Sequence, residues 1–321
     1  MCGTVGRKAA ARAATAYFVG LVGLVGLVGF CCTRARAEPV VREARIESAR
    51  GVALGTGMRA NALATHAQAD NTANLPFGGL YHLESFFGYQ PSLKRIGAGG
   101  SVVDSMTNRL AMGLSARGLF GDNDSGDNSG WEGRLGLGLP LADIISIGVA
   151  GRYANFTVSD PKARPEHNAT ETAPADRTYK LKAFTMDASV SIRPIEGLSI
   201  AGLGYNLIDT GSPLAPLLAG GGLAFGKNGF SMGGEVLVDV NTHKLFSGPK
   251  LQMGGGLEYL AQGAAPFRVG YMYDQGRNQH SITGGLGYID RNFGAQLSLR
   301  QVVSDPKDTT LFSVVQYFIQ N

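Results

Sequence analysis

The chain has 321 residues, of which 44% are hydrophobic and 17% are charged, with 29 Lys and Arg against 25 Asp and Glu. Residues 1–37 contain five of the basic residues and no acidic residue, which leaves 24 basic and 25 acidic residues, a net charge of −1, in residues 38–321. A chain this close to neutral after its first segment carries no electrostatic sign of a nucleic-acid partner, and we expect none.

The first 37 residues have the order of parts that a secretory signal peptide has. Arg7, Lys8 and Arg12 make the start basic, residues 13–32 are an apolar run, and residues 33–37 end in an Ala-x-Ala pattern. We therefore predict a cleaved signal peptide over residues 1–37 and export of the rest. The apolar run is longer than is usual for a signal peptide, so an uncleaved membrane anchor is the alternative.

The sequence contains few candidate residues for catalysis or metal binding. All three cysteines (Cys2, Cys31 and Cys32) lie inside the predicted signal peptide, so the mature chain would have no disulfide, thiolate metal site or cysteine nucleophile. The five histidines show no metal-ligand spacing, and we can assemble no Ser, His and Asp arrangement on one wall. We therefore expect no metal, no cofactor and no enzymatic activity.

Residues 38–79 differ from everything that follows. Residues 38–47 are a charged leader, and Ser48–Leu80 is rich in Ala and Gly without any strand alternation. We predict short helical or irregular structure in this segment, broken at Pro76.

From residue 80 onward the sequence alternates between apolar and polar residues. In residues 230–240, for example, Phe230 and Met232 fall on one face, and Ser231 and Glu235 on the other. Such alternation predicts β-strands with one apolar face, each close to the roughly ten residues that a tilted strand needs to cross a membrane. We predict about fourteen strands. They are residues 80–89, 95–104, 109–120, 131–139, 144–156, 179–193, 198–207, 217–225, 230–240, 250–260, 267–274, 280–288, 291–301 and 311–319.

Two all-β architectures give this pattern, a soluble sandwich and a transmembrane barrel. The connections favour the barrel, because short turns alternate with longer polar loops, as the two ends of an outer-membrane barrel require. No segment after residue 37 is long and apolar enough for a membrane helix, and a sheet in lipid must close on itself. We predict a transmembrane antiparallel up-and-down β-barrel over residues 80–321, in the lipid of a Gram-negative outer membrane.

Aromatic residues lie near the strand ends, where a membrane interface favours them. We assign to the outer interface Phe120, Trp131, Tyr153 and Phe156. We assign to the inner interface Tyr259, Phe267, Tyr288, Phe293, Tyr317 and Phe318.

Strand positions that face away from lipid combine charges of both signs with glycines. The charged, lumen-lining positions are Arg117, Glu132, Arg134, Arg152, Asp187, Arg193, Glu235, Asp239, Glu258, Arg268, Asp274 and Arg300. They predict either a network of ion pairs that fills a narrow lumen or a polar conduit. Glycines such as Gly136, Gly138, Gly254 and Gly256 would let other backbone come close, and Ser48–Leu80 is the segment available to plug the lumen.

The opening of the predicted mature chain resembles that of FadL/PorV-type outer-membrane β-barrel proteins. Three stretches carry the resemblance: residues 48–57 (SARGVALGTG), residues 67–73 (AQADNTA) and residues 74–80 (NLPFGGL). The family has an Ala-Arg-small-Gly-Met-Gly-Gly run, an Asp-Asp-Ala-Ser-Ala stretch and an Asn-Pro-Ala-Gly-Leu motif before its first strand. This chain departs by a residue inserted between Asn74 and Pro76, and by a shorter length than a typical fatty-acid transporter.

The resemblance implies a hatch, formed within residues 38–79, that occupies the lumen. The matching residues would act as hatch or gating residues rather than catalysts: Gly55, Gly57, Asp70, Asn74, Pro76 and Leu80. One branch of the family implies a hatch-gated transporter or channel for small hydrophobic molecules. The alternative is a PorV-like structural or accessory protein that binds partners of a secretion or motility complex and transports nothing.

Overall fold

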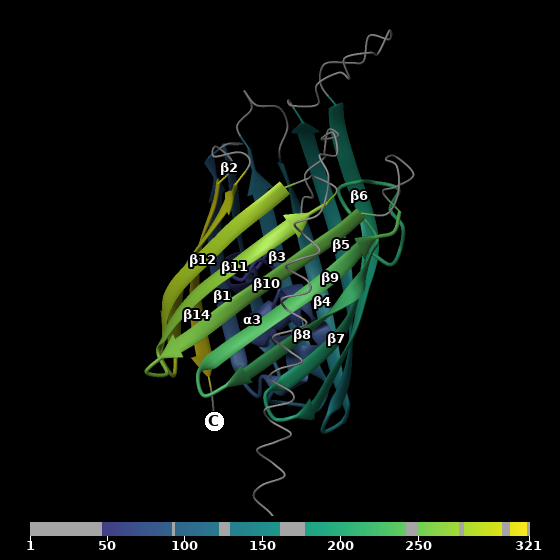
Figure 1. Ribbon diagram of the computed structural model, residues 1–321. Helices are drawn as coiled ribbons and strands as arrows, with labels where there is room; N and C mark the ends of the chain where they lie inside the picture. Colours follow the sequence, from purple (N-terminus) through teal and green to yellow (C-terminus); the bar gives the residue numbers. More distant parts are fainter. Residues whose placement is uncertain are drawn as a thin grey trace, which may run out of the picture. The chain divides into compact units, whose positions relative to one another are not determined.

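The computed structural model describes residues 47–91, 94–121, 129–160, 177–241, 250–275, 279–303 and 309–319, all within one compact unit. The predicted signal peptide (residues 1–37) and residues 38–46 of the predicted leader lie outside the described residues. A ring of tilted strands surrounds residues 47–77 (Figure 1).

Fourteen antiparallel strands form the ring, which closes because β1 pairs with β14 as well as with β2. In chain order they are β1 (Tyr81–Gln90), β2 (Arg95–Asp104), β3 (Ala111–Phe120), β4 (Ser129–Ala142), β5 (Ile145–Asp160), β6 (Arg177–Ile195), β7 (Leu198–Tyr205), β8 (Leu218–Lys227), β9 (Phe230–Asp239), β10 (Lys250–Ala261), β11 (Ala265–Asp274), β12 (Gln279–Ile289), β13 (Phe293–Val302) and β14 (Thr309–Ile319). The predicted barrel and its strand number are confirmed. Below, the inner end is the one at which β14 and the described chain end.

Most strand boundaries agree with the prediction to within a few residues, but β5 and β6 extend further at their outer ends. Their pairing continues from Phe156 and Leu181 to Asp160 and Arg177. Polar outward residues such as Thr157 and Lys180 occupy these ends, so the apolar alternation fades before the hydrogen bonding does. Apolar alternation therefore marks the part of a strand that faces lipid rather than the whole strand.

The two faces of the ring differ as a membrane barrel requires. On β1, Leu83 is 55% exposed on the outside, whereas Glu84 is 3% exposed on the inside. Arg134 on β4 is likewise buried inside the ring. A soluble sandwich would reverse this arrangement, so that alternative is wrong. None of the described helices is long and apolar enough to cross a bilayer.

Two of the predicted interface aromatics face inward instead. Phe156 on β5 is 2% exposed and packs inside the ring, and Phe318 on β14 is buried against the ring of His82. Strand alternation explains both corrections, because each residue stands an odd number of positions from an outward aromatic, Tyr153 and Tyr317 respectively.

Inside the ring, the chain forms four short segments, as predicted for this Ala- and Gly-rich stretch. They are α2 (Ala49–Ala53), η1 (Arg59–Asn61), α3 (Ala64–Asp70) and η2 (Thr72–Phe77). Ser48 caps α2, because its hydroxyl accepts a hydrogen bond from the Gly51 amide at 3.0 Å. Residues 47–77 are called the hatch below.

The expected break at Pro76 is wrong in its position. Pro76 lies inside the 3₁₀ helix η2, which ends one residue later at Phe77. The fixed φ of proline suits a 3₁₀ turn, so proline this close to the end of a short helix is tolerated.

Candidate functional site

Each segment of the hatch lies against its own sector of the wall. The α2 helix contacts β11 to β14, α3 contacts β1 to β3, η2 contacts β3 to β6, and η1 contacts β7 to β9. The four segments together contact every strand except β10, and Gly55 and Gly57, between α2 and η1, lie against Gly254 and Gly255 of β10.

Charged side chains join α2 to its sector. The Arg50 guanidinium contacts the Glu258 carboxylate at 2.8 Å, and Arg268 contacts the same carboxylate at 2.5 Å. At the start of the hatch, Glu47 pairs with Arg300 at 2.5 Å. Of the predicted lumen-lining residues, Glu258 and Arg300 therefore contact the hatch directly, and Arg268 contacts Glu258.

Backbone carbonyls of α2 are held as well. The Thr283 hydroxyl donates to the Ala53 carbonyl and the Ser298 hydroxyl donates to the Ala49 carbonyl, each at 2.8 Å. Because a helix leaves its last carbonyls without helical partners, the Thr283 hydroxyl satisfies an Ala53 carbonyl that would otherwise be costly to bury.

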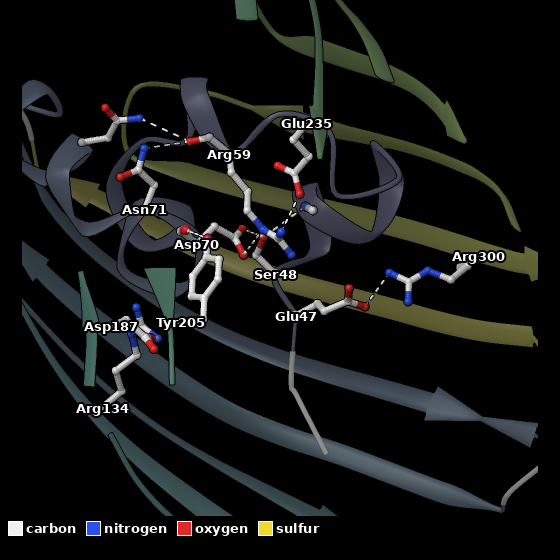
Figure 2. A network of polar contacts seen from close by, with 12 residues as sticks. Glu47, Ser48, Arg59, Asp70, Asn71, Arg134, Asp187, Tyr205, Glu235 and Arg300 are labelled. Carbon is white, nitrogen blue, oxygen red and sulfur yellow. Dashed lines mark hydrogen bonds and ion pairs between the residues drawn. The ribbon is translucent and has the colours of Figure 1, made fainter. Parts of the chain in front are cut away.

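Arg59 of η1 joins the hatch to β9. Its guanidinium lies 2.5 Å from the Glu235 carboxylate, 3.9 Å from Asp70 and 5.3 Å from the centre of the Tyr205 ring. Asp70 also accepts a hydrogen bond from the Ser48 hydroxyl at 2.8 Å, and Figure 2 shows Ser48, Arg59, Asp70 and Glu235 close together.

Hydrogen bonds join η2 to β5 and β6. The Asn71 amide donates to the Ser191 hydroxyl at 3.0 Å, and the Ala73 N–H donates to the Ser189 hydroxyl at 3.0 Å. The Ser146 hydroxyl donates to the Ala73 carbonyl. In the neighbouring sector, Thr65 of α3 donates to Glu84 of β1 at 2.6 Å.

Glycines let the hatch and the wall come this close. A Cβ atom at Gly148 would lie 2.1 Å from the Ala73 nitrogen, and one at Gly254 would lie 2.0 Å from the Gly55 carbonyl oxygen. From the hatch side, a Cβ at Gly57 would lie 2.4 Å from the Gly255 Cα. Gly55 also has a φ of +58°, which favours glycine.

The other hatch residues that the resemblance singled out lie in three different places. The Asn74 amide donates to the Ala60 carbonyl at 2.9 Å, which joins η2 to η1. Pro76 lies against the backbone position of Gly138 in β4. Leu80 instead follows the hatch at the inner rim, where its backbone exchanges hydrogen bonds with Ser105.

Of the twelve predicted lumen-lining residues, eleven lie inside the ring and are buried or nearly so. The twelfth, Arg193, is half-buried and lies over the Phe77 ring of the hatch, 3.7 Å from its centre. Arg134 pairs with Asp187, and Arg152 pairs with Glu132 at 3.4 Å, in the sector of β4 to β6. Arg117 lies over the Phe86 ring, 5.4 Å from its centre. Asp239 is buried near the outer end of β9, where it stands opposite Lys250. The interior charges thus form contacts with one another and with the hatch.

Sequence reasoning missed an apolar collar inside the outer half of the barrel. Its wall residues, all buried, are Phe86, Leu119, Ala154, Phe156, Val158, Leu181, Phe312 and Val314. Leu214 and Ala215, from the connection between β7 and β8, complete it, and Ala49 and Val52 of the hatch form its floor. The sequence does contain a signal for the collar, namely pairs of adjacent apolar residues such as Phe86-Phe87 and Leu311-Phe312. Because successive side chains of a strand point to opposite faces, one residue of each pair must face the inside.

A second apolar cluster lies between η1 and its sector of the wall. Leu54, Met58 and Ala60 of the hatch pack there against the wall residues Ala201, Leu203, Tyr205, Leu218, Ala224 and Leu237. This second cluster is called the seam below. Apolar side chains of the hatch also meet the wall at the floor of the collar and in the α3 sector, where Ala62, Ala67 and Leu75 pack against Val103 and Ala111.

Two titratable groups of the hatch have shifted pKa values. Burial lowers the pKa of His66 well below its ordinary value, and the nearby cations Arg50 and Arg268 lower it further. Burial alone would lower the pKa of Arg50, but the charge and hydrogen bonds of Glu258 raise it above the ordinary value. The hatch in this position therefore holds His66 neutral and Arg50 charged.

The described part of the chain shows no constellation for catalysis. No group of three His, Cys, Asp or Glu side chains there could hold a metal ion. Residues 229–233 do spell Gly-x-Ser-x-Gly, a pattern that the sequence reasoning overlooked. Ser231 lies in the hairpin of β8 and β9, opposite Gly226 and Glu258, and not in the strand-to-helix turn of a nucleophile elbow.

No family model and no curated protein matches this sequence. Among solved structures, the toluene transporter TbuX of Ralstonia pickettii matches with a TM-score of 0.54 at 13% identity, over 86% of this chain and 98% of that chain. The toluene transporter TodX of Pseudomonas putida matches with 0.53 at 13% identity, over 88% and 99%. A FadL homologue of Pseudomonas aeruginosa matches with 0.54 at 13% identity, over 88% and 99%. The resemblance is thereby confirmed at the level of the fold.

Proposed function

We propose that this protein is an outer-membrane channel for small apolar molecules and that the hatch closes it. The apolar collar carries the proposal. Buried Phe86, Phe156 and Phe312 inside the outer mouth offer no hydrogen bonds to a polar solute. An apolar molecule is stabilised there because it leaves water for an apolar surface.

The surroundings of the collar support an apolar ligand of modest size. Its wall residues come from β1, β3, β5, β6 and β14, which lie along the half of the ring that runs from β14 to β6. Two of the solved structures with this fold are toluene transporters, and we extend that substrate class, small monoaromatic hydrocarbons, to this chain as part of the proposal.

Below the collar the hatch must move for anything to pass. Removal of residues 48–77 should therefore open the lumen. We expect liposomes that contain the shortened chain to swell in a small sugar, and liposomes with the full chain to swell far less. Heat-modifiable migration on a gel would show that both chains fold as barrels.

Uptake of a labelled monoaromatic hydrocarbon by cells tests the ligand class. Cells that produce the full chain should accumulate the label faster than cells without it, and a sugar of similar size should show no such gain. Equal hydrocarbon uptake with and without the protein would contradict the proposal. A partner protein recovered in stoichiometric amounts from those cells would then favour the structural alternative.

A further inference from the structure

We infer that apolar molecules pass the hatch on one side only, through the seam between η1 and the wall of β7, β8 and β9, and that the Arg59–Glu235 pair is its gate. The inference rests on the proposed function, because it locates the path that transport would need.

The seam continues the apolar surface of the collar. Leu214 and Ala215 belong to the collar, and Leu218, three residues later on the same stretch of chain, belongs to the seam. From there Leu203 and Leu237 carry the apolar surface along the wall, and Ala224 lies beyond Glu235 toward the inner end. A molecule that leaves the collar beside Ala215 therefore meets Leu218, Leu203 and Leu237 before it reaches Arg59 and Glu235.

The other sectors would be costly for the same molecule. Between α2 and its sector stand the Arg50–Glu258 pair and the hydroxyl of Thr283 bonded to the hatch backbone. Between η2 and its sector stand the hydrogen bonds of Ser189 and Ser191. The α3 sector has an apolar cluster at its inner end, around Val103 and Ala111, but the Thr65–Glu84 hydrogen bond stands between that cluster and the collar. An apolar molecule in these sectors would leave several buried polar groups without partners, whereas in the seam it would replace apolar contacts with apolar contacts, except at the Tyr205 hydroxyl, which donates to the Asp70 carbonyl.

Small wall residues leave room for passage once η1 shifts. Gly222, Ala224 and Gly233 face the hatch along β8 and β9. Met58 fills the space beside Gly233, since a Cβ atom there would lie 2.6 Å from the Met58 sulfur. An unbranched thioether side chain adapts to a changing gap more readily than a branched one.

The gate pair stands across this path. Arg59 and Glu235 are both almost fully buried, and their side chains meet at 2.5 Å. On its other side Arg59 already has Asp70 at 3.9 Å, and the Asn71 amide donates to the Arg59 carbonyl at 3.1 Å. When Arg59 leaves Glu235 it therefore keeps a carboxylate partner within the hatch, which makes the separation reversible.

Glu235→Gln removes the charge from the gate and keeps the shape of the side chain. We expect its swelling rate in a small sugar to rise about tenfold, because one partner of a buried ion pair is left without the other. The matched variant is Glu258→Gln, the same substitution at the ion pair of the α2 sector. We expect it to raise the swelling rate by less than a third of that amount, because the Thr283 and Ser298 hydroxyls still hold α2 to its wall.

Cysteine accessibility gives a second readout that does not depend on flux. Residues 38–321 contain no cysteine, so Ala224→Cys reports on the seam and Ser298→Cys on the α2 sector. In the Glu235→Gln background, a small water-soluble thiol reagent should modify residue 224 about tenfold faster than in the parent background, and residue 298 at an unchanged rate.

The outcomes separate the inference from the proposed function. If cells take up no hydrocarbon through the full chain, the proposed function fails. If uptake occurs but Glu258→Gln opens the lumen as much as Glu235→Gln does, the seam is not the path. Protection of residue 224 in the Glu235→Gln background would overturn the inference in the same way, with the channel function intact.

Discussion

At the scale of single residues, the fit between hatch and wall depends on what is missing from the wall. Gly148, Gly254 and Gly256 stand where a Cβ atom would meet hatch backbone at less than 3 Å. The backbone of another segment cannot move aside as the end of a flexible side chain can, so even one added methyl group must displace the hatch.

Gly148→Ala should therefore loosen the hatch while the barrel remains intact. The added Cβ would lie 2.1 Å from the Ala73 nitrogen, and overpacking of this kind typically costs about 1–3 kcal/mol. Faster proteolysis within the hatch of the detergent-extracted protein would show the effect. Gly133→Ala, on a wall position with no other atom within 4 Å of the new Cβ, should leave the proteolysis rate unchanged.

His66 makes the closed hatch sensitive to acid. The closed position lowers the pKa of His66 below 6.5, so a withdrawn hatch binds a proton there more readily. Stability of the closed position is complete above about pH 6.5 and is lost progressively as the pH falls below it. Arg50, Arg268, His82 and Glu258 are the charged or titratable groups that act on His66.

Swelling rates measured from about pH 7.5 down to about pH 5 test this dependence. The rate of the full chain should rise as the pH falls, and His66→Gln should flatten the rise because its amide does not titrate. An equally steep rise in His66→Gln would assign the acid sensitivity to another group.

At the scale of elements, the strands could be predicted and the occupant of the lumen could be predicted only in part. Alternation is a property of neighbouring residues, so it marked β9 and β10 correctly to within a residue. The collar could not be predicted in the same way, because Phe156 and Phe312 are apolar residues at inward positions, where alternation predicts polar ones. Phe156 was assigned to the outer interface, and Phe312 was assigned to neither face. The partner of Arg59 could not be predicted either, since Glu235 lies 176 residues away and only the closed ring brings the two together.

Adjacent residues of β14 lie on opposite faces of the strand, so substitutions there can test the inner and outer faces separately. Phe312 faces the collar and Leu311 is 45% exposed on the outside. Phe312→Gln should lower the uptake of a monoaromatic hydrocarbon several-fold, because a polar group in the collar weakens binding of an apolar molecule. Leu311→Gln should leave uptake for each folded molecule unchanged and reduce the resistance of the barrel to unfolding. Equal losses of uptake in both variants would argue against the collar as the binding surface.

At the scale of the whole molecule, closure of the ring makes the other features possible. Residues of β1 and β14, more than two hundred positions apart, pair along nine consecutive positions from Tyr81–Ile319 to Tyr89–Leu311. Without that pairing both strands would present free backbone N–H and C=O groups to lipid, at a cost of several kcal/mol for each group. The sequence alone predicted closure correctly on this ground, because lipid allows no open sheet.

A chain that ends at residue 308 should therefore fail to form the barrel. It lacks β14, so β1 and β13 have no partner on one side, and because these two strands run in the same direction they cannot form the antiparallel pairing that closes the ring. We expect this chain to show no heat-modifiable migration after extraction in detergent, whereas the chain without residues 48–77 keeps all fourteen strands and should show it. If the chain that ends at residue 308 migrated as a folded barrel, pairing of β1 with β14 would not be what holds the ring closed. Some other rearrangement of the wall would then have to close the sheet.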